Sequence, residues 1–347
     1  MYSIDKSGFK NYLNNFYKQI QESNDLYVKA NISLKSENIQ NILYLGMGGS
    51  AIAGDILNDV LFDSLNIPLR VTRGYYAPKF CDSNTLVIAA SYSGNTEETL
   101  MAIDSIADSG AQFVVITSGG TLKERAKEKN WGIIEIPEGY PPRQALGYIF
   151  FPLYHMLGNL GLLNDYDPDL SQLIKFTKEM SKRNDYTMTD SHILSRELAQ
   201  TIHKKIPIIY STAPYLSSIS RRWQNQMQEN GKSLAFSNVL PEFNHNEIVG
   251  WELEQPCVKD FIVIFVENEN PLPRIKQRIE LSKKIIKDRG VEVVDIYSAG
   301  ETNLEKVFSL IILGDWVSYY LALAYKKSPQ DIKNIDYLKS QLAKFEN

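Results

Sequence analysis

The segment TLVIAASYSGNTEETL, residues 85–100, joins a mainly apolar run to a loop of hydroxyl side chains and then to an acidic stretch. The apolar run is typical of a buried strand, and the acidic residues suit the first turn of a helix. A strand, a polar loop and a helix in this order form part of a βαβ unit. We therefore predict a parallel sheet in which the loop at residues 91–96 lies at the ligand-binding edge.

The same order recurs through both halves of the chain. In the first half, strands are predicted at residues 41–45, 68–72, 85–90, 112–117 and 132–136, with helices between most of them. In the second half, strands are predicted at 206–210, 233–237, 261–266 and 291–296, and helices at 215–228, 272–289, 304–325 and 332–344. Near-continuous apolar strands that alternate with helices indicate parallel sheets covered on both faces. The sequence thus predicts an α/β protein with two doubly wound sheets.

The length of 347 residues agrees with about two domains. We expect an N-terminal domain at residues 1–165, which binds phosphate, and a C-terminal domain at 191–347. The polar stretch at 166–190 is interpreted as a helical connector between them.

The charge and composition of the chain limit the classes of partner that it is expected to bind. The net charge is −4 with acidic and basic residues interspersed, so we expect neither nucleic acid nor a membrane as partner. Two cysteines that lie far apart in the sequence argue against a disulfide framework and favour a cytoplasmic location.

Residues 1–21 lack the apolar core of a signal peptide. The apolar stretch at 307–325 carries Asp315 in its middle, which favours a buried core helix over a membrane span.

The glycine-rich loop GMGGSA, residues 46–51, has three interpretations. It matches the dinucleotide pattern G-x-G-x-x-A, but that pattern expects an acidic residue about 20 positions later. The chain has Arg70 and Arg73 in that region, which could be argued to favour NADP. The loop could also be a packing turn without a ligand. The second hydroxyl-rich loop at 91–96 favours the third interpretation, a phosphate cradle.

Ser93 is also a candidate hydrolase nucleophile. The nucleophile elbow requires G-x-S-x-G, and SYSGN does not supply it. We therefore interpret Ser91, Ser93 and Thr96 as hydroxyl donors to an oxyanion. Glycine amides and helix N-termini add further donors and a favourable dipole, so the two loops could hold a phosphate without a lysine.

Five segments resemble a known family. GMGGSAIAGDIL from residue 46, SYSGNTEETL from 91 and PEGYPPRQALG from 137 are similar to sugar isomerase (SIS) domains. QENGK at 228–232 and EFNHNEIVGWE at 242–252 narrow the resemblance to the bifunctional phosphoglucose/phosphomannose isomerase family. The resemblance covers essentially the whole chain and implies two tandem SIS domains with flavodoxin-like, three-layer αβα folds.

The resemblance implies where a hexose 6-phosphate binds. Its phosphate would be held by Gly49, Ser50, Ser91, Ser93 and Thr96, with Arg143 near the C1–C2 end of the sugar. The second half carries YSTAPY at 210–215 in place of a GGS loop, so we expect one phosphate site per chain.

Interconverting an aldose and a ketose requires a base, a ring-opening acid–base pair and a cation near the enediolate oxygens. From pattern alone, Glu229 is a surface residue at a helix end and His245 is a loop histidine. The resemblance makes Glu229 the base, Arg143 the stabilising cation, and His245 with Lys339 the ring-opening pair. Other lysines lie close to Lys339 in sequence, and a solvated charge run is the alternative there.

The resemblance also implies a homodimer, in which His245 reaches the site of the neighbouring subunit. No cofactor is expected. The sequence lacks H-E-x-x-H and clustered His/Cys patterns, which predicts catalysis without a metal. His155 is interpreted as a packed core or interface histidine.

We therefore expect an isomerase that interconverts glucose 6-phosphate, and mannose 6-phosphate, with fructose 6-phosphate through an enediolate. An isomerase of another phosphosugar is one alternative, and a non-catalytic phosphosugar sensor is another. We expect neither a regulator's helix-turn-helix nor the cysteine-nucleophile domain of a glutamine-dependent synthase.

Overall fold

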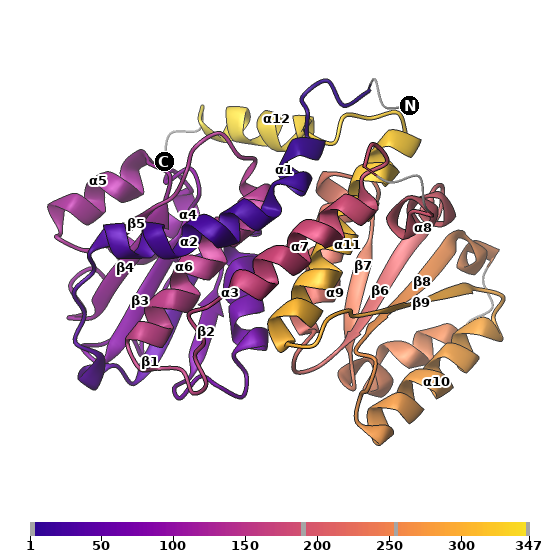
Figure 1. The fold of residues 1–347 in the computed structure, drawn as a ribbon, viewed down its shortest axis with the longest axis horizontal. Coiled ribbons are helices and arrows are strands. Elements are labelled where there is room, and N and C mark those ends of the chain that lie inside the picture. The colour runs from indigo at the N-terminus through magenta and orange to yellow at the C-terminus, as the bar shows by residue number, and fades with distance from the viewer. Residues whose placement is uncertain (1–3, 189–191, 253–255, 345–347) are drawn as a thin grey trace.

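The computed structural model describes residues 4–188, 192–252 and 256–344 (Figure 1). Its strands are β1 (Asn41–Gly46), β2 (Leu69–Thr72), β3 (Thr85–Ala90), β4 (Gln112–Thr117), β5 (Gly132–Glu135), β6 (Ile206–Thr212), β7 (Phe236–Leu240), β8 (Phe261–Glu267) and β9 (Glu292–Tyr297). Its α-helices are α1 (Lys10–Asn14), α2 (Phe16–Ala30), α3 (Gly48–Val60), α4 (Glu97–Asp104), α5 (Gly120–Glu128), α6 (Leu146–Asn159), α7 (Ser171–Asn184), α8 (Leu194–Ile202), α9 (Ser217–Glu229), α10 (Pro273–Lys287), α11 (Asn303–Ala324) and α12 (Lys333–Leu342). Short 3-10 segments are η2 (Ser36–Asn38), η3 (Pro142–Gln144), η4 (Glu242–His245), η5 (Glu247–Glu252) and η6 (Pro256–Asp260).

Two parallel sheets organise the chain, one in each half (Figure 1). The first has the strand order β2-β1-β3-β4-β5, and the second has β7-β6-β8-β9. All the strand pairs are parallel. The first order is flavodoxin-like, and the second is its four-stranded equivalent, so the prediction of two doubly wound sheets is confirmed. In both sheets the strand order reverses beside the strand that comes first in the chain, β1 or β6. Folds of this kind bind ligands at that point, beyond the carboxyl ends of the strands.

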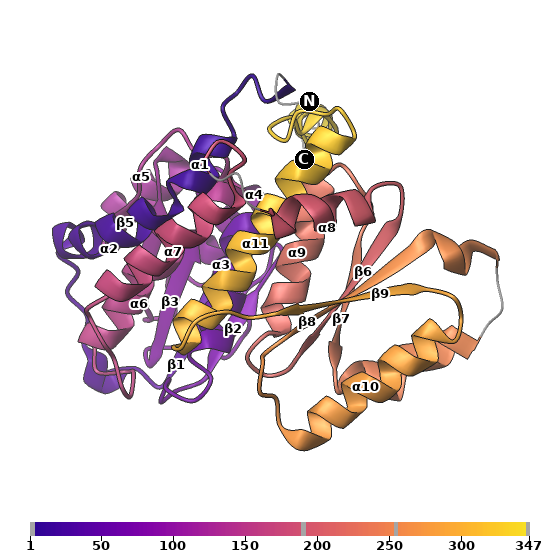
Figure 2. The same cartoon turned by 45° about the vertical axis from the view of Figure 1, so that its right-hand side comes forward.

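Helix α11 is the central helix between the two halves. It packs against α7, α8 and α9 (Figures 1 and 2). Its length and apolar composition would allow it to cross a membrane, but 94% of its most apolar 18-residue stretch is buried in the protein. Asp315 in its middle accepts hydrogen bonds from Arg222 Nη2 and Gln226 Nε2, each at 2.7 Å. The interpretation as a buried core helix is therefore confirmed.

Several predicted boundaries differ from the structure. The strand predicted at 233–237 lies at 236–240, because the residues after α9 first turn back along that helix, where Ser233 N–H donates to the Met227 carbonyl. Helix α3 begins at Gly48, so Gly49 and Ser50 belong to its first turn. The proposed domain boundaries stay a prediction, and α7 from the predicted connector packs on both α2 and α11.

Candidate active site

Hydroxyl groups from two loops gather at the carboxyl ends of β1 and β3. Ser91 Oγ and Thr96 Oγ1 lie 2.8 Å apart. The Tyr92 N–H donates to Ser50 Oγ at 3.3 Å, which joins the loop to the first turn of α3. The side chain of Ser93 is exposed at the same loop. Helices α3 and α4 both begin here, so their free N–H groups add to a cradle suited to an anion.

Two glycines allow the segments of this cradle to approach each other. A Cβ at Gly49 would lie 3.0 Å from the Arg143 Cα, because the first turn of α3 lies against the turn at Pro142. Gly94 has a φ of +68°, and a Cβ there would lie 1.8 Å from the carbonyl oxygen of Gly119. A side chain at either position would push these segments apart. Gly49 thereby brings Arg143 next to the hydroxyl loops.

Arg143 is buried and is held mainly by residues of the second half of the chain. Its Nε donates to Asn230 Oδ1 at 2.6 Å. Its Nη2 donates to the carbonyls of Pro329 and Gln330 at 2.9 and 3.1 Å. Its Nη1 lies 3.5 Å from Glu229 Oε2. Burial lowers the pKa of Arg143, and the carboxylate of Glu229 opposes that shift. The guanidinium therefore joins the phosphate cradle to the predicted base.

Glu229 ends α9 and faces a cavity of about 610 Å³. The lining comprises Gln228, Glu229, Lys232, Lys327, Ser328, Asp331, Ile332, Lys333, Asn334 and Ile335. The Lys232 ammonium donates to the carbonyl of Glu229 and, at 2.6 Å, to that of Asp331. Burial, and then the charge of Arg143, lower the pKa of Lys232 to about 8. A carboxylate thus lies in this cavity beside two basic groups, an arrangement suited to proton transfer.

Lys232 and Asn230 are functional candidates that the sequence analysis did not single out. Both lie in the QENGK segment, whose Asn-Gly pair after a helix indicates a tight reversal. Lys232 has a φ of +57°, which agrees with such a turn. This turn signal could have suggested that both side chains fold back toward the end of the helix. It could not have suggested which groups they bind.

His245 and Lys339 are not brought to this site within one chain. Glu229 ends α9 and His245 lies in η4, beyond β7, and His245 does not line the cavity that Glu229 faces. Lys339 lies on α12 with its side chain exposed, and it does not line the cavity of Glu229. The structure therefore gathers Gly49, Ser50, Ser91, Ser93, Thr96, Arg143 and Glu229, while the roles of His245 and Lys339 stay predictions.

Comparison with known proteins identifies the family. The model of the bacterial phospho-glucose isomerase C-terminal SIS domain matches residues 191–342. A bifunctional phosphoglucose/phosphomannose isomerase from Caldicellulosiruptor bescii is 39% identical over 333 residues, which covers 96% of this chain and 98% of the relative. The chain belongs to this family. The predicted resemblance of the chain to bifunctional phosphoglucose/phosphomannose isomerases is therefore confirmed.

Two further similarities concern a relative with a different name and a solved structure. A D-glucosamine-6-phosphate 4-epimerase from Sulfolobus acidocaldarius is 36% identical over 231 residues, or 66% of this chain and 69% of the relative. The solved structure of a hypothetical protein from Thermus thermophilus matches with a TM-score of 0.75 at 17% identity. That match covers 98% of this chain and 91% of the other. It supports the fold of this phosphoglucose/phosphomannose isomerase family member.

Other candidate groups in this family member have ordinary structural roles. Arg73, considered for NADP, forms an ion pair with Asp55. His155 is buried, its Nδ1 lies 2.9 Å from the Tyr166 hydroxyl, and burial lowers its pKa, which confirms the interpretation as a core histidine. Within residues 4–188, 192–252 and 256–344, no group of three or more His, Cys, Asp or Glu side chains is arranged to hold a metal.

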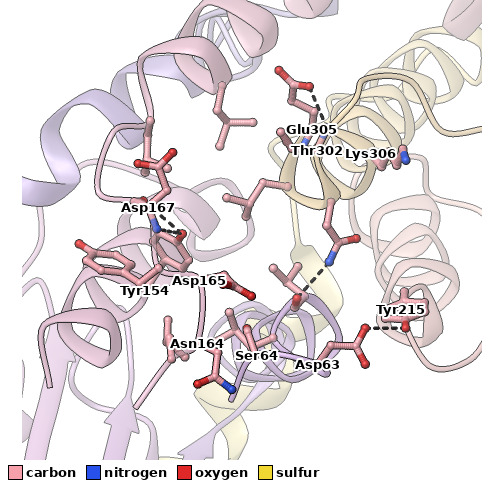
Figure 3. Close-up of a pocket in the computed structure, with 18 of the residues that line it drawn as sticks. Asp63, Ser64, Tyr154, Asn164, Asp165, Asp167, Tyr215, Thr302, Glu305 and Lys306 are labelled. Carbon is pink, nitrogen blue, oxygen red and sulfur yellow. Dashed lines mark hydrogen bonds between the residues drawn. The ribbon is translucent and has the colours of Figure 1, made fainter. Parts of the chain in front are cut away.

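A second cavity, of about 590 Å³, lies at the equivalent edge of the second sheet and is lined by residues of both halves of the chain (Figure 3). Tyr215, which follows β6, lines it and donates to Asp63 at 2.6 Å. The N–H of Ser218, at the start of α9, donates to the buried carboxylate of Asp59 at 2.6 Å. The start of α11 is closed by the capping box of Thr302 and Glu305. These helix starts are bonded to groups of the chain itself, which agrees with a single phosphate site in the first half.

Proposed function

We propose that this chain interconverts glucose 6-phosphate and mannose 6-phosphate with fructose 6-phosphate by moving a proton between C1 and C2. The observation that carries the proposal is the 3.5 Å approach of Arg143 Nη1 to Glu229 Oε2, beside the hydroxyl loops. The reaction needs a base and a cation at one end of a substrate whose other end is a phosphate. The name and close similarity of the Caldicellulosiruptor bescii relative support the same reaction.

Each group has a separate task in this mechanism. Ser50, Ser91, Ser93 and Thr96, with the backbone of Gly49, hold the phosphate. Glu229 removes the proton from C1 or C2 and returns it to the other carbon, and Arg143 stabilises the negative charge of the enediolate oxygens. His245 and Lys339 open the sugar ring. Neither a cofactor nor a metal takes part, so a chelator is expected to leave the rate unchanged.

We further infer a cytoplasmic homodimer, in which His245 of one copy completes the site of the other. Within one chain His245 does not line the cavity that Glu229 faces, which supports a contribution from a second copy. Helix α12 carries exposed apolar side chains at Ile335, Leu338 and Leu342, which recur at helical spacing and would be covered by that copy.

A second candidate function is epimerisation at C4 of an amino sugar phosphate, which the Sulfolobus acidocaldarius relative favours. That reaction changes a carbon remote from C1 and leaves the aldose an aldose. The two reactions therefore give different products, and identifying the products is sufficient to distinguish them.

The test is to incubate the purified chain in parallel with glucose 6-phosphate, mannose 6-phosphate and glucosamine 6-phosphate and to identify the products by ¹³C NMR. We expect fructose 6-phosphate from the first two substrates and no change in the third. Formation of a C4 epimer from glucosamine 6-phosphate, without fructose 6-phosphate, would establish the rival reaction. Binding of all three without turnover would identify a sensor.

A further inference from the structure

Asn230 is a buried amide that joins the two halves of the chain at the candidate site. Its side chain is fully buried, its Oδ1 accepts from Arg143 Nε at 2.6 Å, and its Nδ2 donates to Ser318 Oγ at 3.0 Å. Arginine can only donate hydrogen bonds, so the amide oxygen must face Arg143 and the amide has one orientation.

The contacts of Arg143 leave one edge of its guanidinium directed at the reaction centre. Nε is bound to Asn230, and Nη2 is bound to the carbonyls of Pro329 and Gln330. The remaining nitrogen, Nη1, faces Glu229. Because the guanidinium is planar, fixing Nε and Nη2 also fixes the direction of the Nη1 hydrogens.

The other side of the Asn230 amide is anchored in the core of the second half. Ser318 donates its own hydroxyl hydrogen to the carbonyl of Asp315 at 2.7 Å. The carboxylate of Asp315 is in turn bound by Arg222 and Gln226. Asn230 is therefore held by a rigid helix, and it can act as a fixed reference point for the guanidinium.

We propose that Asn230 is a positioning residue of the isomerase, and this inference rests on the function proposed above. Asn230 is not assigned a contact with the substrate. It binds Nε of Arg143 and so aims Nη1 at the space shared by Glu229 and the C1–C2 end of the sugar. Without an acceptor at this position, the guanidinium can rotate, and its charge no longer meets the enediolate oxygens in a fixed geometry.

Two substitutions that nearly keep the shape of Asn230 distinguish a positioning role of this residue from a packing role. Asn230→Leu removes the acceptor, and Asn230→Asp keeps one facing Nε. We expect Asn230→Leu to lower kcat for fructose 6-phosphate by about 10- to 100-fold with KM within about 3-fold, because the phosphate loops are untouched. Asn230→Asp should retain kcat within about 10-fold of the wild type.

A control variant and a second background complete the test. Ser318→Ala removes the anchor of the amide but leaves the acceptor that faces Nε of Arg143, so it should lower kcat by a smaller factor than Asn230→Leu. In an Arg143→Lys background, which has no Nε donor, Asn230→Leu should cost less than about 3-fold in kcat. The inference is overturned if Asn230→Leu keeps wild-type kcat, or if it lowers kcat by the same factor in the Arg143→Lys background as in the wild type. An inactive wild type would instead refute the proposed function.

Discussion

Arg143 is a residue whose burial is unfavourable by itself and whose contacts offset that effect. Taking a guanidinium out of water lowers its pKa, as the structure indicates for this side chain. Asn230, two backbone carbonyls and the carboxylate of Glu229 compensate by filling its donor sites. Phe9 adds a ring whose centroid is 5.6 Å from the Arg143 Cζ. A buried charge with a perturbed pKa and this many partners is typical of a functional site.

The hydroxyl of Thr96 is expected to contribute to substrate binding and little to chemistry. It lies 2.8 Å from Ser91 Oγ, where both could donate to a phosphate. Thr96→Val keeps the shape and removes the donor. Since a hydrogen bond to a charged group is worth about 1.5–3 kcal/mol, KM for fructose 6-phosphate should rise about 10- to 100-fold with kcat nearly unchanged. Steady-state kinetics measure both values.

Thr99, in the first turn of α4 directly after Thr96, supplies the matched control. It is buried, and its hydroxyl has no hydrogen-bond partner in the part of the chain that the structure describes. Thr99→Val should therefore leave KM unchanged. An equal rise of KM in both variants would mean that distortion of α4, rather than a lost phosphate donor, is responsible.

At the scale of elements, α3 and α9 meet where Asp59 caps the start of α9. The Asp59 carboxylate accepts from the Ser218 N–H, and burial raises the pKa of Asp59 to about 6, against that hydrogen bond. A carboxyl whose pKa is raised in the folded state stabilises the fold most when protonated. The stability that the protonated carboxyl contributes is fully present below pH 3.8, the ordinary pKa of the group, and it is lost as the pH rises through about 6.

This linkage predicts the pH dependence of an Asp59→Asn variant, which cannot titrate at this position. From pH 5 to pH 8, the free energy of unfolding of the wild type should fall by about 1.4 kcal/mol relative to the variant. Urea unfolding of both proteins at the two pH values measures the difference. A difference that does not change with pH would show that Asp59 does not couple protonation to folding.

The strands could largely be predicted from sequence, whereas one element and part of the site could not. Buried parallel strands such as β3 are continuous apolar runs, so their pattern is unambiguous. Strand β7 lies at the edge of its sheet with Phe236 exposed, so hydrophobicity misplaced it by three residues at each end. The roles of Asn230 and Lys232 depend on groups as distant as Arg143, 87 residues away, which no local pattern reveals.

At the scale of the whole molecule, the two sheets have related strand orders but different edges. The first edge presents the side-chain hydroxyls of two loops and the N-termini of α3 and α4, while at the second edge the starts of α9 and α11 are bonded to Asp59 and to the capping box of Thr302 and Glu305. The end of α9 and the segment between α11 and α12, both from the second half, approach the first edge and bind Arg143. We infer that the first half holds the substrate's phosphate, and the second half supplies the base.

The proposed shared site predicts complementation between two inactive variants. In a dimer of one Glu229→Gln chain and one His245→Ala chain, one site carries both substitutions and the other carries neither. Random reassociation makes about half of the dimers mixed, each with one intact site, so about a quarter of the wild-type activity should return. Unfolding and refolding the two variants together, followed by an activity assay, measures this recovery.

The same experiment has a clear opposite outcome. If His245 served the site of its own chain, every site in the mixture would lack one group. Activity after joint refolding would then equal the sum of the separately refolded variants, and the shared site would be refuted.

The central claim is that Glu229 moves the proton in an aldose–ketose isomerisation, and ¹H NMR of fructose 6-phosphate in D₂O tests it most directly. The wild type should form glucose 6-phosphate and mannose 6-phosphate and exchange the C1 proton of fructose 6-phosphate for deuterium. Glu229→Gln should slow both processes by at least about 1,000-fold while calorimetry still detects binding of fructose 6-phosphate. Isomerisation by Glu229→Gln at a rate within about 3-fold of the wild type would contradict the account.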